Sequence, residues 1–176
     1  MRTVIRKLKE EAGAEILEAA LVLPILFMFL LGIVWFGRAF NIYSTITQAA
    51  QQGAIAAARP ICATCGNTTS DAQVITVVDG VLQSSHLDPL QIPVNSKAPT
   101  VTSACSAAAP APLCATTAGN ITICRSVILN PTGATDPVQC GAIVSFQYPF
   151  QFYLPFTSLN NQQIILTAQA QTRMEN

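Results

Sequence analysis

The chain begins with a long apolar segment that contains no charged residue. It covers residues 19–37, between Glu18 and Arg38, and twelve of its nineteen residues are Leu, Ile, Val or Phe. As an α-helix this segment would be about 28 Å long, close to the ~30 Å thickness of the hydrocarbon core of a bilayer. Its twelve large apolar side chains would favour the membrane by about 5 kcal/mol, and Pro24 and Gly32 are tolerated in helices that cross lipid. The pattern therefore predicts a transmembrane helix.

A removable secretory signal peptide is the alternative explanation for this segment. The apolar region of a signal peptide normally holds about 7–15 residues and is followed closely by a cleavage site of small residues. Here the apolar run is longer, and suitable small residues appear only at 54–58. Basic residues precede the segment at Arg2, Arg6, Lys7 and Lys9. This excess of positive charge predicts a cytoplasmic N-terminus, with the bulk of the chain outside.

The helical pattern continues beyond the apolar segment. Aromatic and then small residues recur at spacings of three and four, at Phe40, Tyr43, Thr47, Ala50, Ala54 and Ala57. Arg59 and Pro60 end the pattern, because proline disfavours a helical conformation in the residue before it. The sequence thus predicts one helix over residues 14–58, about 67 Å long. Two packing partners remain open for its stripe: a helix of another subunit, which we favour, or the chain's own outer domain.

The remaining residues, 59–176, predict a small outer domain. Thr69-Ser70-Asp71 offers a helix cap, and apolar residues at helical spacing predict a short helix over 71–85. Residues 86–118 are rich in Pro, Ala, Ser and Thr and predict an irregular loop. Strands are expected over 120–129, 140–148 and 163–172. Short connections favour an antiparallel meander, so the fold class is α+β: the long N-terminal helix, membrane-spanning in its first half, and a small disulfide-stabilised domain with a short helix and about three antiparallel strands.

All six cysteines lie in this outer domain, at Cys62, Cys65, Cys105, Cys114, Cys124 and Cys140. An even number outside the membrane predicts disulfides, although six cysteines allow fifteen connectivities. Nearness in sequence favours the pairs Cys62–Cys65, Cys105–Cys114 and Cys124–Cys140. The first pair also has the dithiol spacing of thiol oxidoreductases, but it follows a membrane helix rather than a strand. A zinc site would need a second close pair of ligands and more than the single histidine, His86.

Composition narrows the range of functions. Nine basic and nine acidic residues give a net charge of +0. The chain therefore has no excess of positive charge of the kind that would predict a nucleic-acid partner. Only 10% of residues are charged and the mean hydropathy is +0.42, which fits a chain partly meant for lipid. Ser84, Ser85, His86 and Asp88 stand in one local turn without the spacing of a catalytic triad. We therefore expect no enzymatic activity, no cofactor and no metal.

The residues before the apolar segment carry the sharpest signal. Glu18 sits at the lipid boundary, where an ionisable group usually marks function, although a place in the first turn of a helix would also suit it and Glu15. A glycine, Gly13, four further residues, a glutamate and a long apolar helix resemble the processing site of type IV prepilins. More narrowly, residues 13–57 look like the TadE-like pseudopilins of the tight-adherence, or Flp pilus, system. The matching residues are Glu18, Ala20-Leu21-Val22-Leu23-Pro24, Gly32-Ile33-Val34-Trp35-Phe36-Gly37-Arg38, Ala49-Ala50 and Gly53-Ala54; Ala19 departs from the aromatic residue that often follows the glutamate.

The resemblance implies processing by a prepilin peptidase. Cleavage after Gly13 would remove a basic leader, residues 1–13, and leave Ala14 as the new N-terminus. The mature chain would then hold five basic and seven acidic residues, a net charge of −2. In such a chain Glu18 would act in subunit assembly by pairing with a free N-terminal amine, since an unpaired charge in an apolar bundle costs several kcal/mol.

The resemblance also implies partners, a location and a function. The partners would be other pilins or pseudopilins, the pilus assembly platform and membrane lipid. The location would be the bacterial inner membrane, crossed once, with the outer domain in the periplasm and with possible incorporation into a surface pilus. The expected function is that of a minor pseudopilin that helps to assemble or prime an adhesive pilus. The alternative is a permanently anchored, disulfide-stabilised binding protein of the cell envelope.

Overall fold

The protein is described by a computed structural model. The described residues are 2–60, 69–94, 99, 101, 104–105, 114–117, 119–130, 137–151 and 163–174, with side chains from residue 16 onward. The chain divides into two compact units, Met1–Phe40 and Asn41–Asn176, hereafter the N-terminal unit and the C-terminal unit.

The first element is the long helix α1, Arg2–Ala58. It ends at the residue predicted from the sequence, because Pro60 follows and disfavours a helical conformation in Arg59. Its start lies earlier than residue 14, so the basic residues before Gly13 are also helical. Pro24 lies inside the helix, as predicted for a proline in a membrane-spanning segment.

The second helix, α2 (Asp71–Ser84), has strong signals at both ends. Ser70 and Gln73 form a reciprocal capping box at its start. At its end the Leu87 N–H donates to the Leu82 carbonyl (2.9 Å) and the His86 N–H to the Gln83 carbonyl (3.0 Å), which is a Schellman motif. The predicted helix over 71–85 is thus confirmed to within one residue. A short 3₁₀ helix, η1 (Pro89–Gln91), follows.

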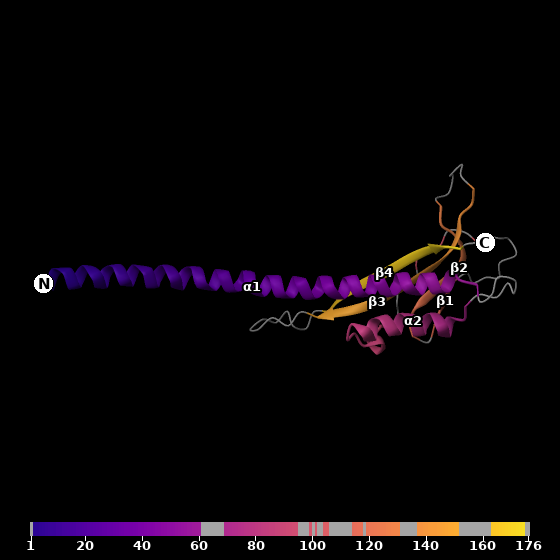
Figure 1. Ribbon diagram of the computed structural model, residues 1–176, viewed down its shortest axis with the longest axis horizontal. Helices are drawn as coiled ribbons and strands as arrows, with labels where there is room; N and C mark the ends of the chain where they lie inside the picture. Colours follow the sequence, from indigo (N-terminus) through magenta and orange to yellow (C-terminus); the bar gives the residue numbers. More distant parts are fainter. Residues whose placement is uncertain are drawn as a thin grey trace. The chain divides into compact units, whose positions relative to one another are not determined.

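The four strands of the described residues are β1 (Cys114–Thr116), β2 (Thr122–Ile128), β3 (Cys140–Gln151) and β4 (Gln163–Arg173). They form one antiparallel sheet in the order β1-β2-β3-β4 (Figure 1). The predicted α+β class and antiparallel meander are therefore confirmed. The sheet has one strand more than the expected three, because β1 lies within the segment predicted to be an irregular loop.

The main core of the C-terminal unit lies between helices and sheet. The end of α1 and helix α2 lie over one face of the sheet (Figure 1). Ala142, Val144, Phe146 and Tyr148 of β3 belong to the same core as both helices, and their spacing of two residues places them on one face of the strand. The helical contribution to this core is largely small or β-branched and comes from Ile46, Ala49, Ala50, Ala54, Ala57, Val74, Val78 and Leu82. Alanine lets α1 approach the sheet closely.

Gly53 marks the closest approach of α1, α2 and the sheet. A Cβ atom placed on Gly53 would lie 2.7 Å from Cγ2 of Val78 in α2 and 3.3 Å from Cγ1 of Val144 in β3. Since real Cβ atoms essentially never come within 3.0 Å of another heavy atom, the packing requires a residue without a side chain here.

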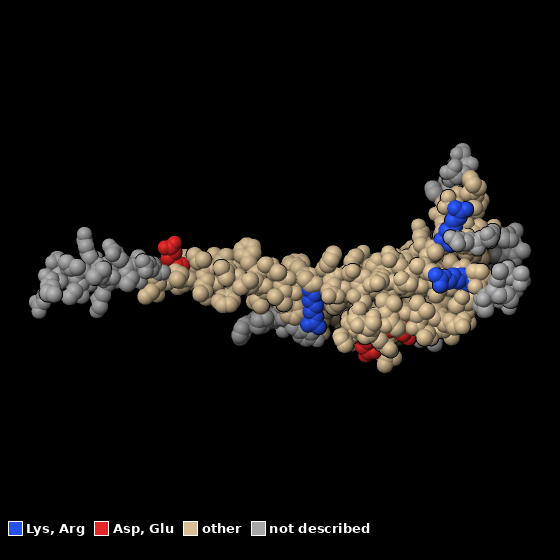
Figure 2. Space-filling model, viewed as in Figure 1, with Lys and Arg blue, Asp and Glu red and all other residues tan. Residues whose placement is uncertain are grey.

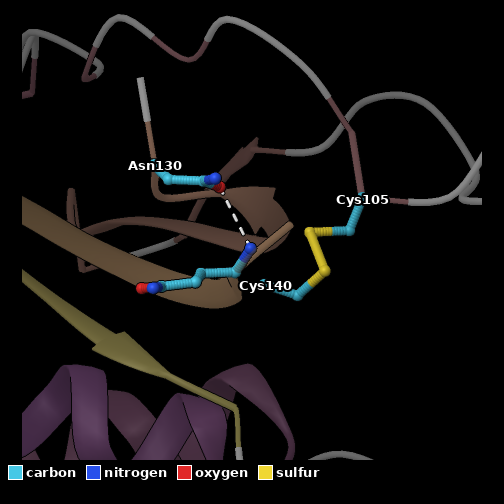
Figure 3. The surroundings of a disulfide bond; sticks show 4 residues. Cys105, Asn130 and Cys140 are labelled. Carbon is cyan, nitrogen blue, oxygen red and sulfur yellow. Dashed lines mark hydrogen bonds between the residues drawn. A yellow bond between two sulfur atoms is a disulfide. The ribbon is translucent and has the colours of Figure 1, made fainter. Parts of the chain in front are cut away.

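Two disulfides end on strands of the sheet, and they correct the predicted pairing. Cys114 of β1 is bonded to Cys124 of β2, and Cys105 is bonded to Cys140 of β3 (Figure 3). Sheet register decides both pairs: Cys114 is directly opposite Cys124, and the Cys105 N–H donates to the Ser126 carbonyl, close to where Ile128 faces Cys140. The pairs Cys105–Cys114 and Cys124–Cys140 were therefore wrong. Cys62 and Cys65 lie outside the described residues.

Candidate functional site

The N-terminal unit presents an apolar helix surface. An 18-residue window within residues 16–58 has a mean hydropathy of 2.6, and none of it is buried inside the protein. Large side chains such as Leu21, Met28 and Phe36 are 66–74% exposed. It is the one helix of the described residues that is long and apolar enough to cross a membrane. A surface of this length and composition is matched to lipid, so the chain has the features of a single-pass membrane protein.

The two ends of the apolar segment carry polar groups suited to a membrane boundary. At its C-terminal end the Arg38 guanidinium lies 5.8 Å from the centre of the Trp35 ring, within range of a cation–π interaction. Tryptophan and arginine are favoured at headgroup depth, where an apolar stem stays in lipid and the polar part reaches water. This pair therefore fits the place where α1 leaves the hydrocarbon core.

Glu18 stands at the other end of the segment, on α1. Its side chain is exposed, and it forms no ion pair with any residue that the structure describes. Gly13 and Ala14 belong to the same helix, but their surroundings lie outside the described part of the chain. Within the described part of the chain the Glu18 carboxylate thus has no ion-pair partner, and the next nineteen residues of the helix carry no charge.

The packing stripe of α1 divides into two parts with different environments. Ala50, Ala54 and Ala57 are fully buried in the core of the chain's own C-terminal unit. Phe40 and Tyr43 are 73% and 49% exposed. The alanine part therefore packs on the chain's own domain, rather than on a helix of another subunit as we favoured from the sequence. The sequence missed this because small residues suit either kind of close approach.

An ion pair that was not predicted from the sequence links α2 to the sheet. Arg125 of β2 donates from Nη1 to the carboxylate of Asp71, the first residue of α2, and from Nη2 to the Thr69 carbonyl at 2.7 Å. The Arg125 side chain is only 22% exposed, so water screens this contact less than it would a surface pair. The residues are far apart in sequence, and no spacing rule could have paired them.

The residues of the rejected catalytic triad have structural roles. His86 adopts a left-handed conformation, with φ of 59°, as the residue that follows the C-cap of α2. The Ser84 hydroxyl donates to the Val81 carbonyl at 2.7 Å, and the Asp88 carboxylate accepts from the Leu90 N–H at 3.0 Å. No group of three His, Cys, Asp or Glu side chains among the described residues could hold a metal ion. The dithiol of Cys62 and Cys65, proposed as a redox alternative, falls outside them.

Two titratable groups of the C-terminal unit are shifted by burial. Desolvation raises the pKa of the Tyr148 phenol, partly offset by the Asp88 N–H, which donates to its oxygen at 3.2 Å; the nearby Asp88 carboxylate adds a smaller increase. Desolvation also raises the pKa of the Asp79 carboxyl on α2. Neither group has a partner typical of acid–base catalysis among the residues described, and both shifts reflect packing.

Comparison with known proteins finds a similarity for the N-terminal helix. Residues 13–54 match the family described as TadE-like protein. No curated protein and no solved structure matches the chain. The match begins at Gly13, includes Glu18 and the whole apolar segment, and ends at the buried Ala54. Over residues 13–54, about a quarter of its length, the chain is thus similar to the TadE-like proteins of the tight-adherence system.

Proposed function

We propose that this chain is a minor pseudopilin that helps to assemble or prime a tight-adherence pilus for surface attachment. The observation that supports this proposal most directly is the family match over residues 13–54. This segment includes the largely exposed apolar residues 19–37, and the Glu18 carboxylate stands directly before them. In this role α1 anchors the subunit in the inner membrane, with its N-terminus in the cytoplasm and the C-terminal unit in the periplasm. Gly32, whose missing side chain leaves open space, would let a neighbouring pilin helix approach.

The proposed maturation step is cleavage of the Gly13–Ala14 peptide bond by a prepilin peptidase. Hydrolysis would convert Ala14 into a free α-amine four residues before Glu18. The Glu18 carboxylate has no ion-pair partner among the described residues, and an amine of its own or a neighbouring subunit would supply one. Because an unpaired charge in apolar surroundings costs several kcal/mol, this pairing would fix the axial register of one subunit against the next.

Intact mass of the protein recovered from membranes tests the maturation step. We expect the native chain to begin at Ala14 and a Gly13→Leu variant to keep Met1. Gly37→Leu is the matched control, since Gly37 also lies on α1 and has open space around it, and it should be processed normally. A native chain that still begins at Met1 would contradict the proposal and favour the alternative, a permanently anchored binding protein whose disulfide-bonded C-terminal unit recognises a ligand.

The role of Glu18 needs a second experiment. A Glu18→Gln variant should insert and be cleaved as the native chain is, but its recovery with sheared pili or pilus assembly complexes should fall at least about tenfold, as a lost charge pair of more than 1.4 kcal/mol requires. Glu15→Gln is the control, with the same chemical change three residues earlier, and should assemble normally. Normal recovery of Glu18→Gln would remove Glu18 from the assembly contact.

A further inference from the structure

The C-terminal unit has one end that must lie near the membrane. It begins at Asn41, and the apolar segment of α1 ends at Gly37, only four residues earlier. Four residues of helix span about 6 Å, so chain connectivity alone holds the Asn41 end of the unit close to the lipid. We call this the membrane-proximal end, and the end at Ala58 the distal end.

Helix α2 returns toward the membrane-proximal end. It starts at the distal end, where the Thr69 N–H and hydroxyl donate to the Arg59 carbonyl at 3.5 and 3.0 Å. Midway along, Val78 packs against the Gly53 position. The helix therefore runs antiparallel to α1, and η1 after it lies at the membrane-proximal end. Leu90 of η1 is 92% exposed there.

Strand β3 runs in the same direction as α2 (Figure 1). Val144 faces Gly53 at mid-height, and four residues later the Tyr148 hydroxyl accepts a hydrogen bond from the Asp88 N–H, just before η1. The far end of β3 and the start of β4 thus also lie at the membrane-proximal end, where Phe150 pairs with Ile164. Ile164 and Ile165 are 45% and 54% exposed, and Tyr43 of α1 is half-exposed at the same end.

Basic residues of this unit have the opposite distribution. Arg59 and Arg173 line a hollow of about 300 Å³ at the distal end, and the Arg125–Asp71 pair is also distal. In Figure 2 the basic atoms of this unit lie toward the end that bears the C-terminus. Besides Asp71, the acidic residues of this unit in the described ranges are Asp79, which follows Val78 at mid-height, and Asp88, which lies at the membrane-proximal end and caps η1 with its carboxylate.

We propose that Tyr43, Leu90, Ile164 and Ile165 form a lipid-docking rim that inserts into the outer surface of the membrane in which α1 is anchored. Amphipathic elements that lie in a membrane interface bury their apolar side chains about 5–10 Å into the boundary between headgroups and acyl chains, and tyrosine is enriched there. Lipid is the favoured occupant because chain connectivity brings it to this end in every molecule, whereas a second copy would have to be recruited.

Tryptophan fluorescence in vesicles that contain brominated phosphatidylcholine tests the rim, because bromine quenches only tryptophans in contact with lipid. The full chain has one tryptophan, Trp35, whose quenching in the native protein reports insertion of α1. In a Trp35→Phe background, Leu90→Trp and Ile165→Trp probe the rim, and Val138→Trp is the matched control. Val138 is 58% exposed and lies two residues before β3 begins, at the distal end.

We expect the probes at positions 90 and 165 to lose about half of their fluorescence or more, most strongly with bromine near the headgroup end of the acyl chain. The probe at position 138 should keep its fluorescence. Four results would overturn the proposal. The first two are a lack of quenching at positions 90 and 165 while Trp35 is quenched, and equal quenching at positions 90, 165 and 138. The other two are a lack of quenching of Trp35 itself, and a blue-shifted emission at positions 90 and 165 that depends on the protein-to-lipid ratio. The last would assign the rim to a second copy of the chain. None of these readings depends on cleavage after Gly13 or on pilus assembly.

Discussion

At the scale of single residues, the core of the C-terminal unit depends on one missing side chain. Gly53 brings α1, α2 and β3 together, with Val78 and Val144 on either side. Both neighbours are β-branched and have few rotamers with which to move away. A methyl group at position 53 would therefore be relieved only by displacing the helices or the sheet.

A Gly53→Ala substitution should lower the free energy of unfolding by about 1–3 kcal/mol, although alanine is the better helix former. Gly80→Ala is the control, because Gly80 lies in α2 with open space around it, and this change should raise stability by about 0.5–1 kcal/mol. Chemical denaturation of both variants measures the difference. If the two substitutions had the same sign, the close approach at Gly53 would be refuted.

The single histidine offers a second residue-scale prediction. His86 occupies the left-handed position of the Schellman motif, where a side chain costs about 1–2 kcal/mol. His86→Gly should therefore stabilise the domain by about 1 kcal/mol and raise its melting temperature. Ser85→Gly provides the comparison: Ser85 has a negative φ of −102°, so glycine brings no relief and should be neutral or destabilising. Stabilisation by both changes would point away from the helix cap.

The limits of sequence reasoning are clear at these positions. A helix cap within Thr69-Ser70-Asp71 could be predicted because its signal is local. The structure places the cap at Ser70 and adds the reciprocal contact with Gln73. The role of Gly53 could not be predicted, since it depends on two residues brought in from α2 and β3. A glycine within a helical pattern shows that a poor helix former is tolerated at that position, but not which residues pack against it.

At the scale of elements, the register of the sheet explains the strand and the disulfide pairs that were not predicted from the sequence. The predicted strands match β2, β3 and β4 closely, because each has alternating or β-branched residues over seven residues or more. Strand β1 has three residues, Cys-Ala-Thr, too few to show a period. Its pairing with β2 is also what places Cys114 opposite Cys124. Missing β1 and choosing the wrong disulfides were thus one error with a common cause.

The two disulfides should contribute unequally to stability. The Cys105–Cys140 bond closes a separation of 35 residues and the Cys114–Cys124 bond one of 10. The loss of chain entropy in the unfolded state predicts roughly 3.8 and 2.7 kcal/mol for these loops at 25 °C. Replacing both cysteines of the longer link with serine should therefore destabilise the domain more than the same change in the shorter link.

Thermal unfolding of the two double-serine variants under oxidising conditions measures that difference. Mass spectrometry of unreduced proteolytic peptides provides the necessary control by confirming that the remaining pairs keep their native partners. Recovery of peptides linked through Cys105 and Cys114 from the native chain would contradict the observed sheet register.

At the scale of the whole molecule, α1 serves both units. Its first part is an exposed apolar surface, and its last part supplies core residues to the C-terminal unit. The sequence divides the chain at residue 58, where the helix ends, whereas contacts divide it at residue 40, inside the helix. The difference matters because the apolar pattern shows where a helix ends but not into which domain's core its side chains pack.

Truncation distinguishes the two boundaries. A chain of residues 41–176 keeps Ile46 and the buried alanines of α1, so we expect it to form both described disulfides and to unfold in one cooperative transition. A chain of residues 59–176 loses these side chains, whose burial contributes about 6 kcal/mol, comparable with the total stability of many domains. It should lack cooperative unfolding and near-ultraviolet circular dichroism. If residues 59–176 instead unfolded as cooperatively as the longer chain, the alanine surface of α1 would be free for a helix of another subunit.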